Sequence, residues 1–287
     1  MLDNADNQNG WRPGQSIEDY HSDRSASSRS QIVDVIELSP LAYYEKTILG
    51  NQPERKQTPS QRFGNLAHCA ILEGPTFFDR HIVAPKFEGK GSKALKDQWK
   101  LDNVGMISVT QQELDDLERM CENVYKHEDA AALLRDGIAE QSGYYTDPQT
   151  GLALRFRPDY YVPEKGILVD LKTADSVREE DFSRSIWNYR YDFQMAMYAE
   201  GIEILDEEPI RYHAMIVVGK TAPFDVAVYL LDRPSLEVGR RDYRRALDLI
   251  KSCTDASKAD PNYKWPSYQS NMKFISLPYW AMKGPIV

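Results

Sequence analysis

The sequence predicts an α/β protein with a central mixed β-sheet flanked by helices. Apolar residues at helical spacing dominate the first half of the chain, three consecutive strand patterns occupy the middle, and helix and strand patterns alternate afterwards. The chain contains no internal repeat and no low-complexity stretch. A single domain is therefore the simplest organisation of these elements.

The length and composition support one large hydrophobic core. The chain has 287 residues, of which 41% are hydrophobic. Residues 1–16 are mostly polar, and we expect them to form a mobile N-terminal tail. The domain would then comprise residues 17–287, with a mainly helical roof over residues 17–135 and the sheet with its flanking helices over residues 136–287.

Helical patterns account for most of the first half. The first helix is capped by Ser28 or Ser30 and ends at Pro40, and a later one ends at Gly74-Pro75. We expect helices over residues 30–38, from residue 41 onwards, and over residues 62–73, 110–126 and 130–136.

Strand patterns begin after Glu140. Three successive strands joined by hairpin turns are expected over GYYTD, LALRFRPDYYV and ILVDLKTA. One amphipathic helix follows over about residues 179–205, and strands follow near residues 212–218 and 225–231. A last long helix begins at Pro234 and ends near residue 252.

Composition bears on the class of function. The formal net charge of −9 argues against nucleic-acid binding, because lysine and arginine normally supply most of the affinity for phosphates. Carboxylates that hold cations, together with a local basic surface, would remove this objection. Residues 86–100 are the best candidate for that surface, since they contain five lysines against Glu88 and Asp97.

Two further classes of protein are disfavoured. The three cysteines are isolated and show no CxxC spacing, which argues against a disulfide framework, a zinc ribbon or an iron–sulfur cluster. There is no apolar run of 18 residues and the N-terminal segment is polar and acidic. We therefore expect a cytoplasmic protein that does not bind membranes.

Two aspartates and a lysine form the clearest chemical pattern. Asp159 lies near the end of one expected strand, while Asp170 and Lys172 alternate on the next strand and so share one face. An exposed ion pair would give the same letters. The apolar residues before Asp170 favour a cleft instead, because burying unpaired charge is costly.

This pattern predicts phosphodiester hydrolysis. The reaction at neutral pH needs a hard cation that polarises the phosphoryl group, and Mg²⁺ prefers oxygen ligands. We expect these ligands to be Asp159, Asp170 and the backbone carbonyl of Leu171. Lys172 would orient the attacking water and stabilise the developing charge.

At these residues the sequence resembles the PD-(D/E)xK nuclease superfamily, and specifically the exonuclease VIII (RecE) family with RecB-like nuclease motifs. Gly64 to His68 is similar to a GxxxH element, Arg157-Pro158-Asp159 and Asp170-Leu171-Lys172 match the two strand motifs, and Gln194 to Tyr198 matches QxxxY. The stretches SSRSQIVDVIELSPLAYY, HIVAPKF, DPQTGLALRFRPD, NYRYDFQMAMY and SLPYWA extend the likeness over about residues 20–280.

The resemblance implies a restriction-endonuclease-like core and further site residues. It implies that His68 and Glu140 are metal ligands. Without the resemblance, a histidine that binds no metal and a solvated glutamate would be the commoner roles at such positions. Gln194 and Tyr198 would support Lys172 and contact DNA from one helix face. Mg²⁺ is the implied cofactor, and Mn²⁺ is expected to substitute for it.

The resemblance also implies an activity and partners. The expected function is a magnesium-dependent exodeoxyribonuclease that degrades linear double-stranded DNA 5′ to 3′ and leaves 3′ single-stranded tails for recombination. The expected partners are linear duplex DNA, a RecT-like single-strand annealing recombinase, and further copies of the chain in a ring-shaped trimer or tetramer. Such a ring could concentrate positive potential in its channel.

DNA contacts are expected in three places. The resemblance places the basic stretch in the DNA channel, while Arg155 and Arg157 flank the expected catalytic strand. Ser28 and Ser30 lie at a helix N-terminus, which favours an anion such as a 5′-phosphate. The expected DNA-binding side chains are Arg155, Arg157, Lys86, Lys90, Lys93, Ser28 and Ser30.

Two alternatives stay open. One is a PD-(D/E)xK nuclease of other polarity or substrate, such as a single-strand exonuclease or an endonuclease, because the same metal site serves all of them. The other is a catalytically silent scaffold that binds DNA ends. The intact set of Asp159, Asp170 and Lys172 argues against the scaffold.

Overall fold

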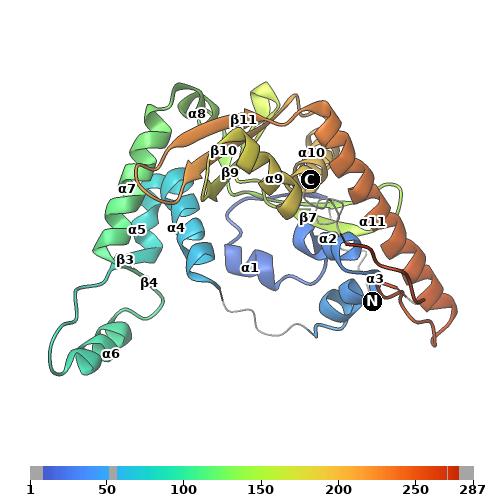
Figure 1. The fold of residues 1–287 in the computed structure, drawn as a ribbon, viewed down its shortest axis with the longest axis horizontal. Helices are drawn as coiled ribbons and strands as arrows, with labels where there is room; N and C mark the ends of the chain where they lie inside the picture. The colour runs from blue at the N-terminus through green and yellow to red at the C-terminus, as the bar shows by residue number, and fades with distance from the viewer. Residues whose placement is uncertain (1–8, 52–56, 270, 278–287) are drawn as a thin grey trace, which may run out of the picture.

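A computed structural model describes residues 9–51, 57–269 and 271–277. It confirms the predicted α/β fold with a central mixed sheet flanked by helices. Figure 1 shows strands β9, β10 and β11 between helix α7 at one side of the molecule and helix α11 at the other. Among the described helices, none combines the length and apolar character needed to cross a bilayer.

The elements have the following bounds. The helices are α1 (Ile17–Ser22), α2 (Arg29–Glu37), α3 (Pro40–Tyr43), α4 (Pro59–Glu73), α5 (Phe77–Arg80), α6 (Ser92–Asp102), α7 (Gln111–Lys126), α8 (Glu128–Leu133), α9 (Glu179–Tyr189), α10 (Tyr191–Asp206) and α11 (Arg233–Ala259). A π-helical turn, η1 (Tyr44–Ile48), extends α3, and short 3₁₀ turns η2 (Gly74–Thr76) and η3 (Pro163–Lys165) join other elements. The strands are β1 (Gly10–Arg12), β2 (Ser27–Ser28), β3 (His81–Val83), β4 (Ile107–Val109), β5 (Ile138–Ala139), β6 (Ser142–Thr146), β7 (Ala153–Phe156), β8 (Tyr160–Val162), β9 (Ile167–Ala174), β10 (Tyr212–Gly219) and β11 (Val226–Leu230).

The central sheet has the strand order β11-β10-β9-β8-β5. Its β9 and β10 are parallel, and the other neighbours are antiparallel. The parallel register places Asp170 beside Met215 and Lys172 beside Val217. Parallel neighbours need a crossover, and α9 and α10 supply it.

A second sheet, with the order β1-β6-β7-β2, corrects one prediction. The segment LALRFRPDYYV does not form one strand: β7 ends at Phe156 in the second sheet, and β8 begins at Tyr160 in the central sheet. Pro158 lies in the break and has no N–H to donate to a ladder. The chain therefore passes from one sheet to the other at Asp159.

The predicted N-terminal tail is wrong for residues 10–12. These residues form β1, which pairs antiparallel with β6. The indole of Trp11 donates to Asp206 Oδ1 at 2.7 Å and stacks on Tyr161 at 5.9 Å between ring centroids. One partly buried aromatic residue thus anchors a segment that is otherwise polar. Residues 1–8 of the predicted tail lie outside the described part of the chain, as does the end of the SLPYWA stretch.

The predicted helix over residues 179–205 is two helices. Arg190 adopts the left-handed conformation, with φ 55° and ψ 47°, between α9 and α10. A non-glycine residue in this region is strained, so surrounding contacts must hold it. The guanidinium of Arg190 pairs with Asp192 at 3.2 Å, Asp242 at 2.7 Å and Glu37 at 2.7 Å.

Each face of the central sheet is covered by helices. Val169 and Leu171 on one face pack in a core shared with Leu66 of α4 and Leu117 of α7. The approach of α4 is close, because a Cβ at Gly64 would lie 3.2 Å from the hydroxyl of Thr173 on β9. Glycine at this position lets α4 approach β9 so closely.

The basic stretch forms an arm that stands out from the body (Figure 1). Strands β3 and β4 pair in parallel at its base, and α6 caps it. No residue of α6 is buried. Lys86, Lys90 and Lys93 are all exposed on this arm.

Candidate active site

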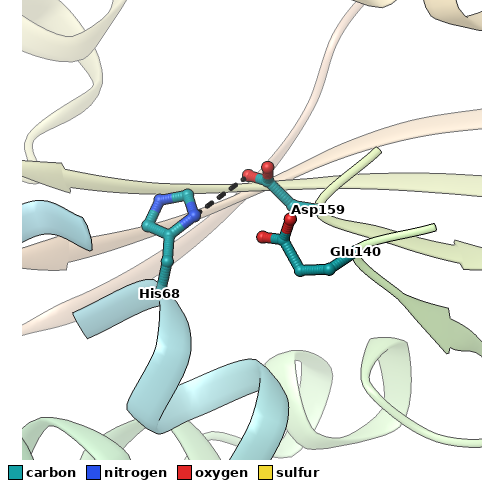
Figure 2. A group of neighbouring side chains, drawn as sticks. All are labelled: His68, Glu140 and Asp159. Atoms are coloured by element: carbon teal, nitrogen blue, oxygen red, sulfur yellow. Dashed lines mark ion pairs between the residues drawn. The ribbon is translucent and has the colours of Figure 1, made fainter. Parts of the chain in front are cut away.

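Three predicted ligands meet in space although they are far apart in the sequence. His68 comes from α4, Glu140 follows β5, and Asp159 precedes β8. Ligand atoms of these three residues all lie within 4.8 Å of one another. Figure 2 shows the imidazole and both acidic side chains converging on one place, and His68 Nδ1 lies 3.6 Å from Asp159 Oδ2.

Backbone contacts fix the two carboxylates. Asp159 Oδ2 accepts a hydrogen bond from the N–H of Leu171 at 2.8 Å, which ties the junction between the sheets to β9. The Glu140 N–H donates to the carbonyl of Asp159 at 3.1 Å. Glu140 has a φ of 52°, and a strained backbone at such a position is typical of functional sites.

Asp170 and Lys172 extend the cluster along β9. The Lys172 ammonium lies 2.6 Å from Asp170 Oδ1 and 3.6 Å from Asp159 Oδ2. Gln194 of α10 also donates to Asp170 Oδ1, at 2.6 Å. The second oxygen, Asp170 Oδ2, is buried and has no hydrogen-bond partner among the described residues. A buried acceptor without a partner is costly and points to a missing ligand.

Burial and mutual repulsion raise the pKa of two acids. Burial, and then the charge of Asp159, raise the pKa of Glu140 to about 7, although Arg157 opposes the shift. Burial raises the pKa of Asp170 to about 7 against the attraction of Lys172. Burial opposes the charge on Lys172, but the Asp170 and Asp159 carboxylates raise its pKa above the ordinary value. Burial lowers the pKa of His68, which leaves a neutral imidazole to act as a ligand.

These groups fit a divalent cation. A positive ion would reduce the repulsion between the clustered carboxylates and would give the unsatisfied buried oxygen a partner. Oxygen donors with one imidazole suit Mg²⁺ or Mn²⁺. His68, Glu140, Asp159 and Asp170 would hold the ion, with the predicted backbone carbonyl of Leu171 as a further donor.

The contribution of Glu140 and Asp170 to the stability of the cation-free protein is expected to fall as pH rises from about 4 to about 7. The ordinary pKa values are 4.5 for Glu140 and 3.8 for Asp170, and both are raised to about 7 in the folded state. In this window the folded chain retains protons that the unfolded chain has released, so raising the pH favours unfolding. Mg²⁺ binds the deprotonated site and should stabilise the protein most above about pH 7.

Thermal unfolding with Mg²⁺ or EDTA across this pH range measures the effect. The double variant Glu140→Gln, Asp170→Asn lacks both titrating acids, so it should gain stability relative to the wild type as pH rises, and its midpoint should depend less on Mg²⁺. An equal pH dependence in the variant and the wild type would contradict the assignment.

The other predicted site residues fall into two groups. Arg157 turns inward, donating to Glu140 Oε2 at 2.9 Å and to Ser142 Oγ at 2.8 Å, and so it holds a cluster carboxylate. Tyr198 lies on α10 as predicted, but its ring packs on Phe156 with centroids 5.7 Å apart. Burial raises the pKa of Tyr198 well above its ordinary value.

Arg155 and the two serines lie apart from the cluster. Arg155 is buried over the ring of Tyr20 and donates to the carbonyl of Asp23, so it is not on a surface that DNA could reach. Ser28 is buried at the start of α2, where its N–H donates to Gln31 Oε1 at 2.7 Å. Its hydroxyl lies 3.1 Å from that of Ser30, which is exposed.

Two residues near the cluster were missed from the sequence. The ring of Tyr191 lies 5.0 Å from the Lys172 ammonium. Tyr191 precedes Gln194 by one helical turn, and that spacing could have indicated it. Arg29 donates to the carbonyls of Tyr189 and Arg190, and no sequence pattern indicated this contact.

Comparisons with known proteins identify a family and a shared fold. A family model described as a PDDEXK-like domain of unknown function (DUF3799) matches residues 28–264. The crystal structure of a candidate exonuclease from Eubacterium rectale matches with a TM-score of 0.55 and 18% identity, covering 89% of this chain and 96% of that one. A phage-related exonuclease from Haemophilus somnus 129PT matches with a TM-score of 0.32 and 11% identity, covering 67% of this chain and 95% of that one.

A search of the curated proteins finds no match. The likeness to the Eubacterium rectale structure, at 18% identity, shows the fold alone. The family model covers most of the chain and includes every member of the cluster from His68 to Gln194. The chain therefore belongs to the family of PDDEXK-like domains of unknown function, DUF3799.

Proposed function

We propose that this protein is a divalent-cation-dependent exodeoxyribonuclease. The observation that carries the proposal is the position of the Lys172 ammonium beside Asp170, whose second carboxylate oxygen is buried without a partner. A lysine beside an unsatisfied carboxylate oxygen suits a reaction in which negative charge develops on a phosphate. The fold that the chain shares with a candidate exonuclease supports the same activity.

The bound cation, Lys172 and Glu140 would have different roles in phosphodiester cleavage. A bound cation supplies positive charge that polarises the scissile phosphate. Lys172 carries three donors and lies on the same strand as Asp170, so it can donate to a phosphate oxygen as charge builds there. The carboxylate of Glu140, which lies in the same cluster, can accept a hydrogen bond from an attacking water.

The substrate proposed is linear double-stranded DNA, degraded from 5′ to 3′ to leave 3′ single-stranded tails. Mg²⁺ is the proposed cofactor, with Mn²⁺ as a substitute. The resemblance to exonuclease VIII supports this polarity, a RecT-like annealing partner, and a ring-shaped trimer or tetramer. A ring would also reconcile the net charge of −9 with DNA binding, since only its channel need be basic.

The arm is the proposed surface for the duplex. Replacing Lys90 and Lys93 with glutamate is expected to weaken DNA binding equally for all sequences, because these exposed lysines would contact phosphates only. Anisotropy titrations over a series of salt concentrations should show a shallower dependence on salt. Lys165→Glu, another exposed lysine on the turn before β9, is the matched control. Equal losses in both variants would contradict the assignment.

The proposed function is tested by digesting DNA labelled at its 5′ end. Linear duplex and closed circular DNA are incubated with the protein in Mg²⁺ or EDTA. Release of 5′-terminal nucleotides from linear DNA alone, and only with Mg²⁺, is the expected result. Release from the 3′ end or cleavage of circles would mean a nuclease of other polarity or substrate. Binding to DNA ends without any cleavage would leave the scaffold as the function.

A further inference from the structure

A row of aromatic rings leads from the core past Lys172 to the surface. Tyr229 stacks on Phe182 with centroids 5.7 Å apart, and Phe182 lies 6.1 Å from Tyr191. Tyr191 is the ring that lies 5.0 Å from the Lys172 ammonium. Tyr189 stacks on Tyr191 at 5.7 Å with an interplanar angle of 26°, and it is 62% exposed. The row therefore ends in an aromatic ring open to solvent, one ring away from the lysine.

The backbone that carries this last ring is held in place from two sides. Arg29 donates to the carbonyls of Tyr189 and Arg190. The side chain of Arg190 is 4% exposed and forms ion pairs with Asp192 and Asp242. The break between α9 and α10 is thus fixed by buried charge pairs, and Tyr189 is presented at a rigid position.

A second exposed aromatic side chain lies two residues earlier on α9. Trp187 is 57% exposed, and the guanidinium of Arg190 lies 4.8 Å from its ring centroid. A single exposed aromatic side chain on a soluble protein needs no explanation. Tyr189 is different, because buried ion pairs hold the backbone beside it and its ring stacks on the ring that contacts the candidate catalytic lysine. This arrangement indicates a surface for a flat ligand.

We propose that Tyr189 forms a stacking platform for the nucleobase next to the scissile phosphate. This inference rests on the proposed nuclease function and adds that the DNA strand reaches Lys172 unpaired. A base inside a duplex has both faces covered by its neighbours, so only a frayed or single-stranded base can stack on a protein ring. The platform would stabilise the open end of a duplex during each cleavage.

The test combines a change in the protein with a change in the DNA. The substrate is an oligonucleotide with a short single-stranded 5′ end, which carries 2-aminopurine at each of its terminal positions in turn. Ca²⁺ replaces Mg²⁺, and a gel checks that the DNA stays intact. The wild type and Tyr189→Phe should quench the fluorescence at one position, whereas Tyr189→Leu should not.

Affinity is the second readout. Tyr189→Leu should bind this DNA about 5- to 150-fold more weakly than the wild type, which is the range expected for one stacked base. An abasic nucleotide at the quenched position should weaken the wild type but leave Tyr189→Leu unchanged. Tyr212→Leu is the matched control, because this tyrosine is 54% exposed at the start of β10.

The outcomes separate this inference from the nuclease proposal. If Tyr189→Leu quenches and binds like the wild type while cleavage persists, the platform is wrong and the nuclease stands. If the variant loses the same affinity on abasic DNA as on normal DNA, Tyr189 acts only through the fold, and the platform is again wrong. If the wild type neither binds nor cleaves DNA with Mg²⁺, the proposed function itself fails.

Discussion

Replacing Lys172 with alanine is expected to slow DNA cleavage by about 10²- to 10³-fold. The ammonium of Lys172 lies 2.6 Å from Asp170 and 3.6 Å from Asp159, and it is the positive side chain in contact with both carboxylates. Without it, the variant has no donor at this place for a phosphate oxygen. Removal of the positive charge should also raise the pKa of Asp170 further. A proton would then compete more strongly with the cation for this carboxylate.

Single-turnover cleavage with protein in excess over linear DNA measures this rate without product release. Lys220→Ala is the matched control, since Lys220 follows β10 and pairs with the exposed Asp175 at 3.4 Å. DNA affinity and the unfolding temperature are measured on the same samples, so that misfolding is detected. Cleavage by Lys172→Ala within tenfold of the wild type would remove this lysine from the active site.

Replacing Arg190 with alanine is expected to cost about 3–5 kcal/mol of unfolding free energy. The change leaves Asp192 and Asp242, which are 4% and 10% exposed at their side chains, without their buried partner. It also removes the contacts that hold residue 190 in its left-handed conformation. Glu37, the third partner, is 46% exposed and should adapt to water more readily.

Urea unfolding of the wild type, Arg190→Ala and Arg233→Ala measures the difference. Arg233 is a matched control because it pairs with Glu237 on the surface of α11, at 2.9 Å, with side chains 89% and 64% exposed. Such a pair contributes less than about 1 kcal/mol. Equal losses for the two variants would show that burial does not determine the strength of the Arg190 cluster.

The sequence was sufficient for those parts of the site that local patterns determine. Asp170 and Lys172 alternate within an apolar strand, so their shared face could be predicted from side-chain period alone. The helix that carries His68 has regular apolar spacing and a clear stop at Gly74-Pro75. The meeting of His68, Glu140 and Asp159 depended on the resemblance, because no local pattern relates them.

Tertiary contacts decided what the sequence did not predict. Aromatic and apolar residues occur on both sides of Pro158, so the sequence predicted one strand where the chain passes from one sheet to the other. The break between α9 and α10 occurs at Arg190, where no glycine marks a helix end in the sequence. It depends on acidic residues contributed by α2, α10 and α11. Arg155 is buried because Tyr20, far away in the sequence, covers it.

The parallel pairing of β9 with β10 affects the order in which the chain folds during its synthesis. In the sequence, α9 and α10 lie between these two strands. The strands can therefore pair only after both helices have been synthesised and folded back. Pairing over such a sequence separation is slow, and it comes late in folding. A growing chain therefore passes through a stage in which His68, Glu140, Asp170 and Lys172 are all present but β9 lacks its neighbour β10. Nascent and truncated chains that end before β10 should bind the cation at this cluster more weakly than the full chain.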